Sequence, residues 1–164
     1  MSKLFWRHLL LIAVFVGIHA ASAQTDLSGT WTFKDQASVS GNLYSNGSPK
    51  TVTIKQDLKT ITIEKVTAGG SGDVSSTETV AFNGTPFETT TASHKKKAIT
   101  GEWSGDKKSF AEIVLVYDAT DSTKLSFKTT DVWSLDSGEL MLDRKAENQA
   151  NGEIWESKAR YNKL

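Results

Sequence analysis

The chain has 164 residues, with 19 basic and 19 acidic side chains, no cysteine and three histidines. This balance of charge argues against a nucleic-acid partner, because nucleic-acid-binding domains carry a clustered basic surface. The absence of cysteine excludes disulfides, thiol nucleophiles and thiolate metal sites. His8 and His19 lie near the start of the chain, so His94 stands alone in the rest, which argues against a histidine-rich zinc site or a Ser-His-Asp triad. We therefore expect no catalytic residues, no metal site and no cofactor.

Residues 1–23 have the pattern of a cleavable secretory signal peptide. Lys3 and Arg7 supply a positive start, residues 9–18 are apolar, and Ala21-Ser22-Ala23 matches a small-x-small cleavage site. A membrane-spanning helix needs about 20 apolar residues, and this run is roughly half that length. We therefore expect cleavage after Ala23, no transmembrane anchor afterwards, and a secreted or periplasmic protein. The remaining chain, residues 24–164, carries 17 basic and 19 acidic side chains.

Residues 24–164 predict a single all-β domain. Its β-type runs alternate with turn signals at the roughly 8–12-residue spacing that is typical of sandwiches and barrels. In chain order, the expected strands are residues 29–33, 51–55, 60–64, 77–82, 87–91, 98–103, 110–117, 123–135, 139–143 and 154–162. Short connections favour antiparallel neighbours, and a closed or nearly closed meander hides the sheet edges. The predicted fold is therefore an antiparallel meander of about 8–10 strands closed into a barrel, with no helix.

The connections between the runs give more local predictions. The second and third runs form the clearest hairpin, and the fourth and fifth flank Asn83-Gly84-Thr85-Pro86, which predicts a second hairpin. Residues 68–76 are rich in Gly and Ser and predict a flexible loop. The run Lys95-Lys96-Lys97 predicts a solvated loop or an edge strand, because edge strands often carry lysine.

The segment Leu27-Ser28-Gly29-Thr30-Trp31 resembles the G-x-W opening of lipocalins and the wider calycin group, and the order of hairpins, including residues 129–140, resembles small exported bacterial lipocalin-like proteins. The resemblance implies a lipocalin-like barrel around a cup for a small apolar ligand. It implies structural roles for Trp31, at the closed end, and for Arg160, laid over that Trp in a cation–π contact. Fatty-acid-binding relatives hold a carboxylate with Arg and Tyr two apart on the last strand. Here Arg160 and Tyr161 are adjacent and should point to opposite faces, which argues against that clamp.

A site in such a barrel would be built from inward-facing residues. Asp131 and Arg144 are polar residues on otherwise apolar faces of neighbouring strands. Two interpretations stay open: a polar pair at a cavity mouth that orients a ligand, or an ion pair at the barrel end, worth about 0–1 kcal/mol if exposed. The candidate ligand-binding residues are Trp103, Tyr117, Phe127, Thr129, Asp131, Trp133 and Arg144.

The sequence therefore favours an exported lipocalin-like protein that binds a small apolar or amphipathic ligand in the barrel. The alternative is a non-catalytic structural or interaction protein of the cell envelope, with a packed barrel and no ligand. A hydrolase using the carboxylates of Asp131 and Glu139 is a third possibility, but no spacing rule brings these two groups together. We therefore expect no enzymatic activity.

Overall fold

The computed structural model describes residues 23–41 and 47–164. The predicted signal peptide lies outside these residues, except for Ala23. In the described ranges every regular element is a strand, and none of the chain there forms a helix suited to crossing a membrane. The strands are β1 (Gly29–Ser40), β2 (Thr51–Gln56), β3 (Thr60–Gly69), β4 (Gly72–Ala81), β5 (Phe87–Thr90), β6 (Lys96–Trp103), β7 (Ser109–Tyr117), β8 (Leu125–Asp136), β9 (Glu139–Asn148) and β10 (Ile154–Lys163).

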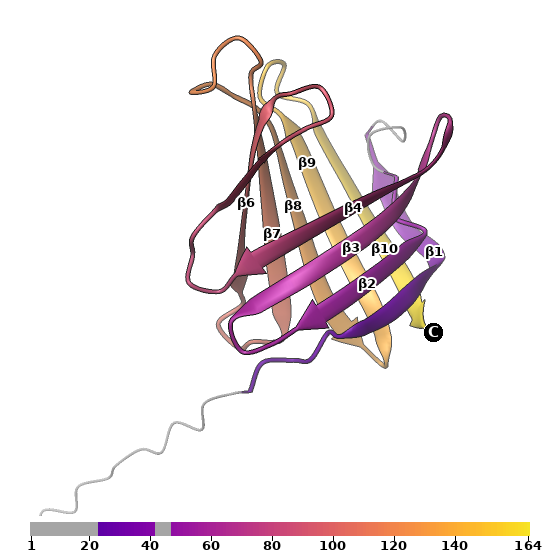
Figure 1. Cartoon of the computed structure of the whole chain (residues 1–164). Coiled ribbons are helices and arrows are strands. Elements are labelled where there is room, and N and C mark those ends of the chain that lie inside the picture. The colour runs from indigo at the N-terminus through magenta and orange to yellow at the C-terminus, as the bar shows by residue number, and fades with distance from the viewer. Residues whose placement is uncertain (1–22, 42–46) are drawn as a thin grey trace, which may run out of the picture.

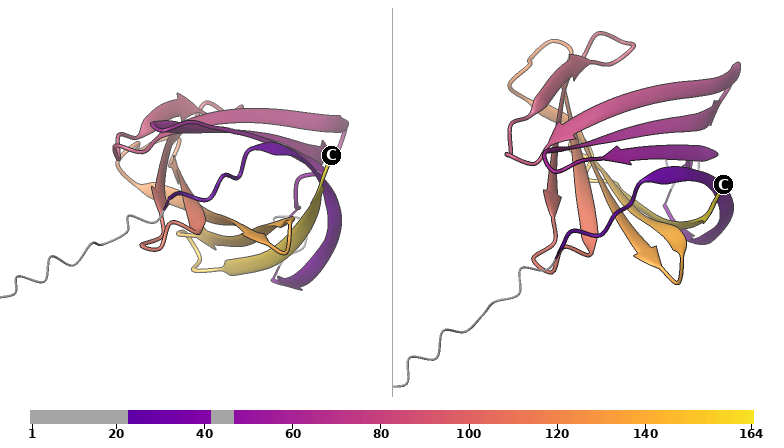
Figure 2. Two further views of the ribbon diagram at one scale, coloured as in Figure 1. Left: turned by 90° about the horizontal axis from the view of Figure 1, so that it is seen from below. Right: turned by 60° about the horizontal axis from the view of Figure 1, so that its bottom comes forward.

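All ten strands form one antiparallel sheet in the order β4-β3-β2-β1-β10-β9-β8-β7-β6-β5. Strand β1 pairs with both β2 and β10, so the first and last strands lie side by side. The sheet curls around an interior, and its two edge strands, β4 and β5, leave a break in the wall (Figures 1 and 2). The predicted all-β meander closed into a nearly complete barrel is confirmed.

The predicted hairpin across residues 83–86 is wrong. Strand β4 pairs with β3, and β5 pairs with β6, so this turn spans the break in the sheet. The Asn83 side chain caps its own turn by accepting a hydrogen bond from the Thr85 amide at 2.9 Å. The Phe82 amide donates to the Lys59 carbonyl at 2.8 Å. The bond from Phe82 ties the start of the loop to the β2–β3 turn, and the chain leaves β4 without folding back along it.

The stretch 68–76 was predicted as a flexible loop and instead forms the β3–β4 hairpin. Gly69 pairs with Gly72, and the strands continue in register to Thr60 and Ala81. Gly72 has a φ of 131°, a conformation that residues with a side chain rarely adopt. The glycines therefore make a tight turn between two strands. The other predicted hairpin, between β2 and β3, is confirmed.

The apolar core fills one end of the barrel. Trp31 is almost fully buried there, and its indole N–H donates to the Leu27 carbonyl at 3.1 Å. This end therefore carries the predicted G-x-W segment. The core consists of Leu27, Trp31, Val52, Ile54, Ile61, Ile63, Val80, Ile99, Phe110, Trp133, Leu140, Leu142, Ala159 and Tyr161.

The predicted contact of Arg160 with Trp31 is wrong. Arg160 donates two hydrogen bonds, of 2.8 and 2.9 Å, to the carboxylate of Asp35. The cation over the Trp31 ring is Lys163, whose Nζ lies 5.3 Å from the ring centroid. The reason is strand alternation: Tyr161 is buried in the core, so Arg160 points outward, while Lys163 falls on the inner face.

Candidate functional site

A cavity of about 240 Å³ lies in the barrel, and we call it the interior cavity. Six strands contribute to its wall: β3, β4, β6, β7, β8 and β9. Five of its ten lining side chains are charged, whereas the core contains no charged side chain. The lining residues are Lys65, Thr67, Ser76, Glu78, Lys97, Val114, Thr129, Asp131, Arg144 and Ala146.

Strand alternation carries these charges to the inside. Lys65 follows the buried Ile63 by two residues on β3, and Glu78 precedes the buried Val80 by two residues on β4. Because alternate residues of a strand share a face, each of these charges must point to the same side as its apolar neighbour. The interior therefore changes from apolar to charged along the barrel axis.

Lys65 joins three carboxylates in a buried network. Its Nζ lies 2.6 Å from Glu112 Oε2, 3.1 Å from Glu78 Oε2 and 3.5 Å from Asp131 Oδ2. Lys97 Nζ pairs with the other oxygen of Glu78. All three acidic residues are less than one-tenth exposed. With the arginine that binds Asp131, these residues make up what we call the ion cluster: Lys65, Glu78, Lys97, Glu112, Asp131 and Arg144.

Arg144 and Asp131 form a bidentate pair. The Nε and Nη2 atoms of Arg144 each donate to Asp131 at 2.7 Å, and Nη1 donates to the Gly47 carbonyl at 3.1 Å. The two residues are direct partners in the register of β8 and β9. The pair suggested by the sequence therefore lies on the wall of the interior cavity, and its carboxylate is buried, not exposed at the barrel rim.

The electrostatics separate the two glutamates of the ion cluster. Burial, a hydrogen bond with Glu78 and the charge of Asp131 raise the pKa of Glu112 to about 7, against the opposing charge of Lys65. Burial is the largest single effect on Glu78 and raises its pKa, but Lys65, Lys97 and the interaction with Glu112 together outweigh burial and hold that pKa far below its usual value. Burial raises the pKa of Asp131, but the charges and hydrogen bonds of Arg144 and Lys65 together outweigh burial and lower that pKa. Glu112 is thus the carboxyl group of the cluster whose pKa is raised, whereas those of Glu78 and Asp131 are lowered.

Two side chains of the ion cluster reach solvent. Lys97 and Arg144 are the most exposed side chains of the ion cluster, at 20% and 13%. Lys97 lies on β6, which approaches β4 across the break. The Lys97 end of the cluster is therefore where a small molecule would first meet these charges.

Three of the seven residues predicted to bind a ligand line the interior cavity: Thr129, Asp131 and Arg144. Trp133 is on the same inward face of β8 but is fully buried in the core, with Lys65 Nζ 6.0 Å from its ring centroid. Strand alternation explains why the β8 residues were found together.

The other three predicted residues do not line the cavity. Phe127 packs against Trp155, with ring centroids 5.6 Å apart, beyond Thr129 on the same strand. Trp103 lies at the far end of β6 from Lys97, where it packs in the aromatic part of the core. Tyr117 follows a register shift in β7 and contacts Lys96 on the outer side. These rings lie away from the ion cluster along or across their strands. Alternation predicts the face on which a residue lies, but it does not predict the residue's position along the barrel axis.

Sequence reasoning missed Lys65, Glu78, Lys97 and Glu112. Lys65 lies just beyond the predicted end of its strand, and Lys97 belongs to a run predicted to be a solvated loop or an edge strand. Glu112 interrupts the apolar face that Phe110 and Val114 define on β7. The pattern that identified Asp131 would also identify these residues: a charged residue on the same face of a strand as apolar residues two positions away.

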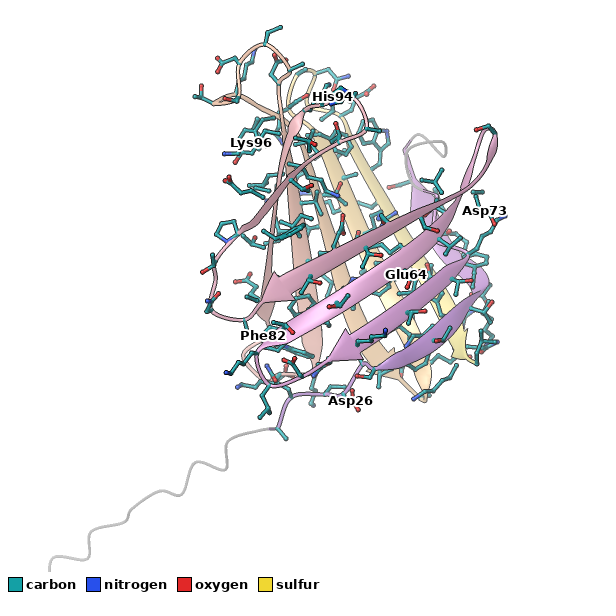
Figure 3. The ribbon with its side chains drawn as sticks, in the orientation of Figure 1. Asp26, Glu64, Asp73, Phe82, His94 and Lys96 are labelled. Carbon is teal, nitrogen blue, oxygen red and sulfur yellow. The ribbon has the colours of Figure 1, made fainter. Side chains whose placement is uncertain are left out.

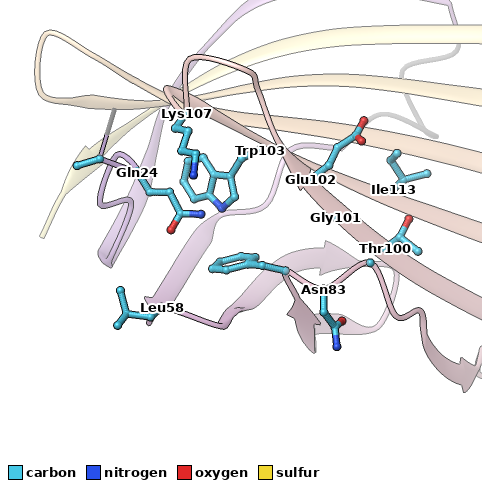
Figure 4. Close-up of a pocket in the computed structure, with 12 residues that line it drawn as sticks. Gln24, Leu58, Asn83, Thr100, Gly101, Glu102, Trp103, Lys107 and Ile113 are labelled. Carbon is cyan, nitrogen blue, oxygen red and sulfur yellow. The ribbon is translucent and has the colours of Figure 1, made fainter. Parts of the chain in front are cut away.

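Two larger hollows lie on the outer surface. The first, of about 920 Å³, is formed by Gln24, Leu58, the β4–β5 loop and the Trp103 end of β6 (Figure 4). The second, of about 560 Å³, lies over β8, β9 and β10 near Val39. Leu58 is 93% exposed, so the first hollow is a shallow groove at the rim. Neither gathers buried ionisable groups as the interior cavity does.

His94 lies in the loop between β5 and β6, at the end of the barrel opposite Asp26 (Figure 3). It is exposed, and its backbone has a φ of 59°. Within residues 23–41 and 47–164, no three His, Cys, Asp or Glu side chains are grouped so as to hold a metal ion. The carboxylates of the ion cluster are instead paired with lysine and arginine.

No family model and no curated protein sequence matches the chain. Among solved structures, it is similar to zebrafish ileal bile acid-binding protein complexed with cholic acid, with a TM-score of 0.46 and 12% identity, over 84% of this chain and 98% of that one. It is also similar to a fatty-acid-binding protein from Manduca sexta, with a TM-score of 0.44 and 12% identity, over the same shares of the two chains. Both likenesses are of fold alone.

Proposed function

We propose that this protein is exported and binds a small amphipathic molecule inside the barrel. The observation that carries the proposal is the interior cavity, about 240 Å³ in volume, with five charged side chains on its wall. This volume is below the roughly 300–1,000 Å³ of most ligand pockets, so the ligand would be small. Its polar part would meet the ion cluster, and its apolar part would meet Val114 and Ala146.

Stability alone is a poor explanation for six ionisable groups in a barrel interior. Desolvating each ion costs several kcal/mol, and replacing a buried ion pair by well-packed apolar residues is often neutral or stabilising by about 1–4 kcal/mol. The rest of this interior is filled by Ile, Val, Leu and aromatic side chains, so apolar residues fit the fold. A charged wall beside a cavity is better accounted for by a polar ligand.

The alternative is a structural or interaction protein of the cell envelope. The packed end of the barrel favours it, because Trp31, Phe110 and Trp133 leave that end filled. On this alternative, the ion cluster would only specify the fold, and purified protein would carry no small molecule.

Native mass spectrometry of the protein purified from its own cells tests both the export and the binding. Export predicts a chain that begins at Gln24, and binding predicts a co-purified small molecule. Thr129→Phe should abolish the bound mass, because Thr129 lines the interior cavity. Thr130→Phe is the matched control, since Thr130 is the next residue on β8 and faces the outer groove.

Each result has a definite meaning. Loss of the bound molecule in Thr129→Phe with retention in Thr130→Phe supports a ligand in the barrel. A bound molecule that survives Thr129→Phe places the ligand elsewhere and contradicts the proposal. A bare protein in a higher assembly favours the envelope alternative, and an intact chain beginning at Met1 contradicts cleavage of the signal peptide.

A further inference from the structure

The charges on the wall of the interior cavity do not balance. The wall carries three cations and two carboxylates: Lys65, Lys97, Arg144, Glu78 and Asp131. The third carboxyl group of the ion cluster, Glu112, is fully buried and binds Lys65 at 2.6 Å, but it is not part of the wall. A molecule in the cavity therefore faces one excess positive charge, which Glu112 compensates from outside the wall only when it is ionised.

The surroundings of Glu112 make it the exchangeable charge. Its Oε1 has no N–H or O–H donor among the described residues. Glu112 and Glu78 both bind Lys65 Nζ, so their carboxyl groups lie close together in the barrel interior. Two adjacent buried carboxyl groups cannot both ionise at low cost, and Glu78 is held ionised by two lysines. The charged groups that act on Glu112 are Lys65 on β3, Glu78 on β4, Asp131 on β8 and Arg144 on β9, and Lys97 on β6 pairs with Glu78.

We propose that the interior cavity binds a small anion and that Glu112 takes up one proton from solvent as the anion enters. This inference rests on the proposed function and names the ligand class. A bound anion meets the excess positive charge of the wall and adds a negative charge near Glu112, which disfavours its ionised form. Once Glu112 is neutral, three cations are balanced by Glu78, Asp131 and the anion. Anion binding and protonation of Glu112 therefore favour each other.

The sign of the pH dependence follows from this balance. The pKa of Glu112 is raised to about 7. Below this pH, Glu112 is already neutral, and the anion binds without proton uptake. Above this pH, binding of each anion requires Glu112 to take up a proton from solvent, so the apparent affinity for the anion falls by up to about tenfold per pH unit. Affinity at pH 8 should therefore be about tenfold weaker than at pH 6.

Isothermal titration with benzoate, which stays ionised over this range and is small enough for the cavity, measures the effect at pH 6, 7 and 8. Benzamide and benzylammonium are matched neutral and cationic probes, and we expect both to bind more weakly than benzoate at pH 6. Titrations at pH 7.5 in two buffers of different ionisation enthalpy should give an uptake approaching one proton per benzoate.

Glu112→Gln tests whether the carboxyl group of Glu112 takes up the proton. A glutamine stays neutral yet can accept from Lys65 and donate to Glu78, so this variant should bind benzoate equally well at all three pH values, without proton uptake. Glu102→Gln, on the exposed face of β6, is the control and should behave like the wild type. The proton count on the wild type decides the question even if Glu112→Gln does not fold.

The outcomes separate this inference from the proposed function. Equal benzoate affinity at pH 6 and 8 without proton uptake overturns the coupling. Benzamide or benzylammonium binding as tightly as benzoate overturns the preference for anions but leaves ligand binding in the barrel intact. If none of the probes binds at any pH, the inference is wrong, and the proposed function then depends on the co-purified molecule alone.

Discussion

At the scale of single residues, Lys65 is the side chain on which the ion cluster depends. Its Nζ is within 3.5 Å of three carboxylates that are each less than one-tenth exposed. Removing one partner of a buried ion pair costs about 3–5 kcal/mol, because the remaining charge stays buried without compensation. An exposed ion pair contributes only about 0–1 kcal/mol. Lys65 should therefore matter more for stability than the lysines of the outer surface.

We predict that Lys65→Met lowers the free energy of unfolding by about 3–5 kcal/mol at pH 8 and by less at pH 5. Without Lys65, burial raises the pKa of the carboxyl groups above their unfolded values, so stability is retained at low pH and lost as the pH rises. Urea unfolding at the two pH values measures this. Lys50→Met is the control, since it removes only the exposed pair with Asp73, and should cost no more than about 1 kcal/mol. Equal losses in the two variants would contradict the role of Lys65.

At the level of strands, the packing of β7 against β6 depends on a glycine. A Cβ atom at Gly101 would lie 2.2 Å from Cζ of Phe110 and 2.9 Å from Cγ1 of Val80. Phe110 and Val80 are fully buried, so neither has room to move outward. Glycine is required at this position of β6 because the aromatic ring of the neighbouring strand packs directly over its backbone.

Gly101→Ala should therefore lower the free energy of unfolding by about 1–3 kcal/mol through overpacking. Gly105→Ala is the matched control, because a Cβ there meets no atom within 4 Å, and its effect should stay within about 0.5 kcal/mol. Both values come from urea unfolding. Phe110→Leu combined with Gly101→Ala should recover part of the loss, and a fully additive double variant would refute the proposed clash.

At the scale of the whole molecule, the barrel is unevenly closed. β5 has four residues, all exposed, and pairs with β6 alone, while the first six residues of β4 are also exposed. Strands β8, β9 and β10 have neighbours on both sides and carry core residues. Local opening costs least where few apolar contacts must be broken. The side of the barrel next to the interior cavity should therefore open first.

Native-state amide hydrogen exchange can test this order. We predict faster exchange for the hydrogen-bonded amides of β5 and of residues 72–76 than for those of β8 and β9, because opening the edge strands exposes little apolar surface. If β5 exchanges as slowly as β9, the break is not a weak point, and a ligand must enter the interior cavity by another route.

Part of the site was open to prediction, and Asp131 shows why. Asp131 lies on the same face of a long strand as Phe127 and Trp133, so it points inward whichever strands pair with its own. Lys65 follows the same rule, but it was missed because its strand was assigned too short an extent. Glu112 lies in the most apolar run of residues 24–164. The apolar residues on either side led to the prediction of a wholly apolar strand, so this single charge was not identified. The local pattern therefore predicts the strand face on which a charge lies. It does not predict how many charges from different strands gather in one cluster.

Local sequence patterns were enough to predict the all-β meander, the β2–β3 hairpin and the inward face of β8, because alternation and turn chemistry act over a few neighbouring residues. Three features could be seen only in the folded molecule: the position of the break in the sheet, the contact of Lys163 rather than Arg160 with Trp31, and the gathering of six ionisable groups from six strands into the ion cluster beside the interior cavity. Those features depend on the register between strands and on the curl of the sheet. Both are set by packing between residues far apart in the chain, such as Lys65 and Glu112, and no local pattern records that packing.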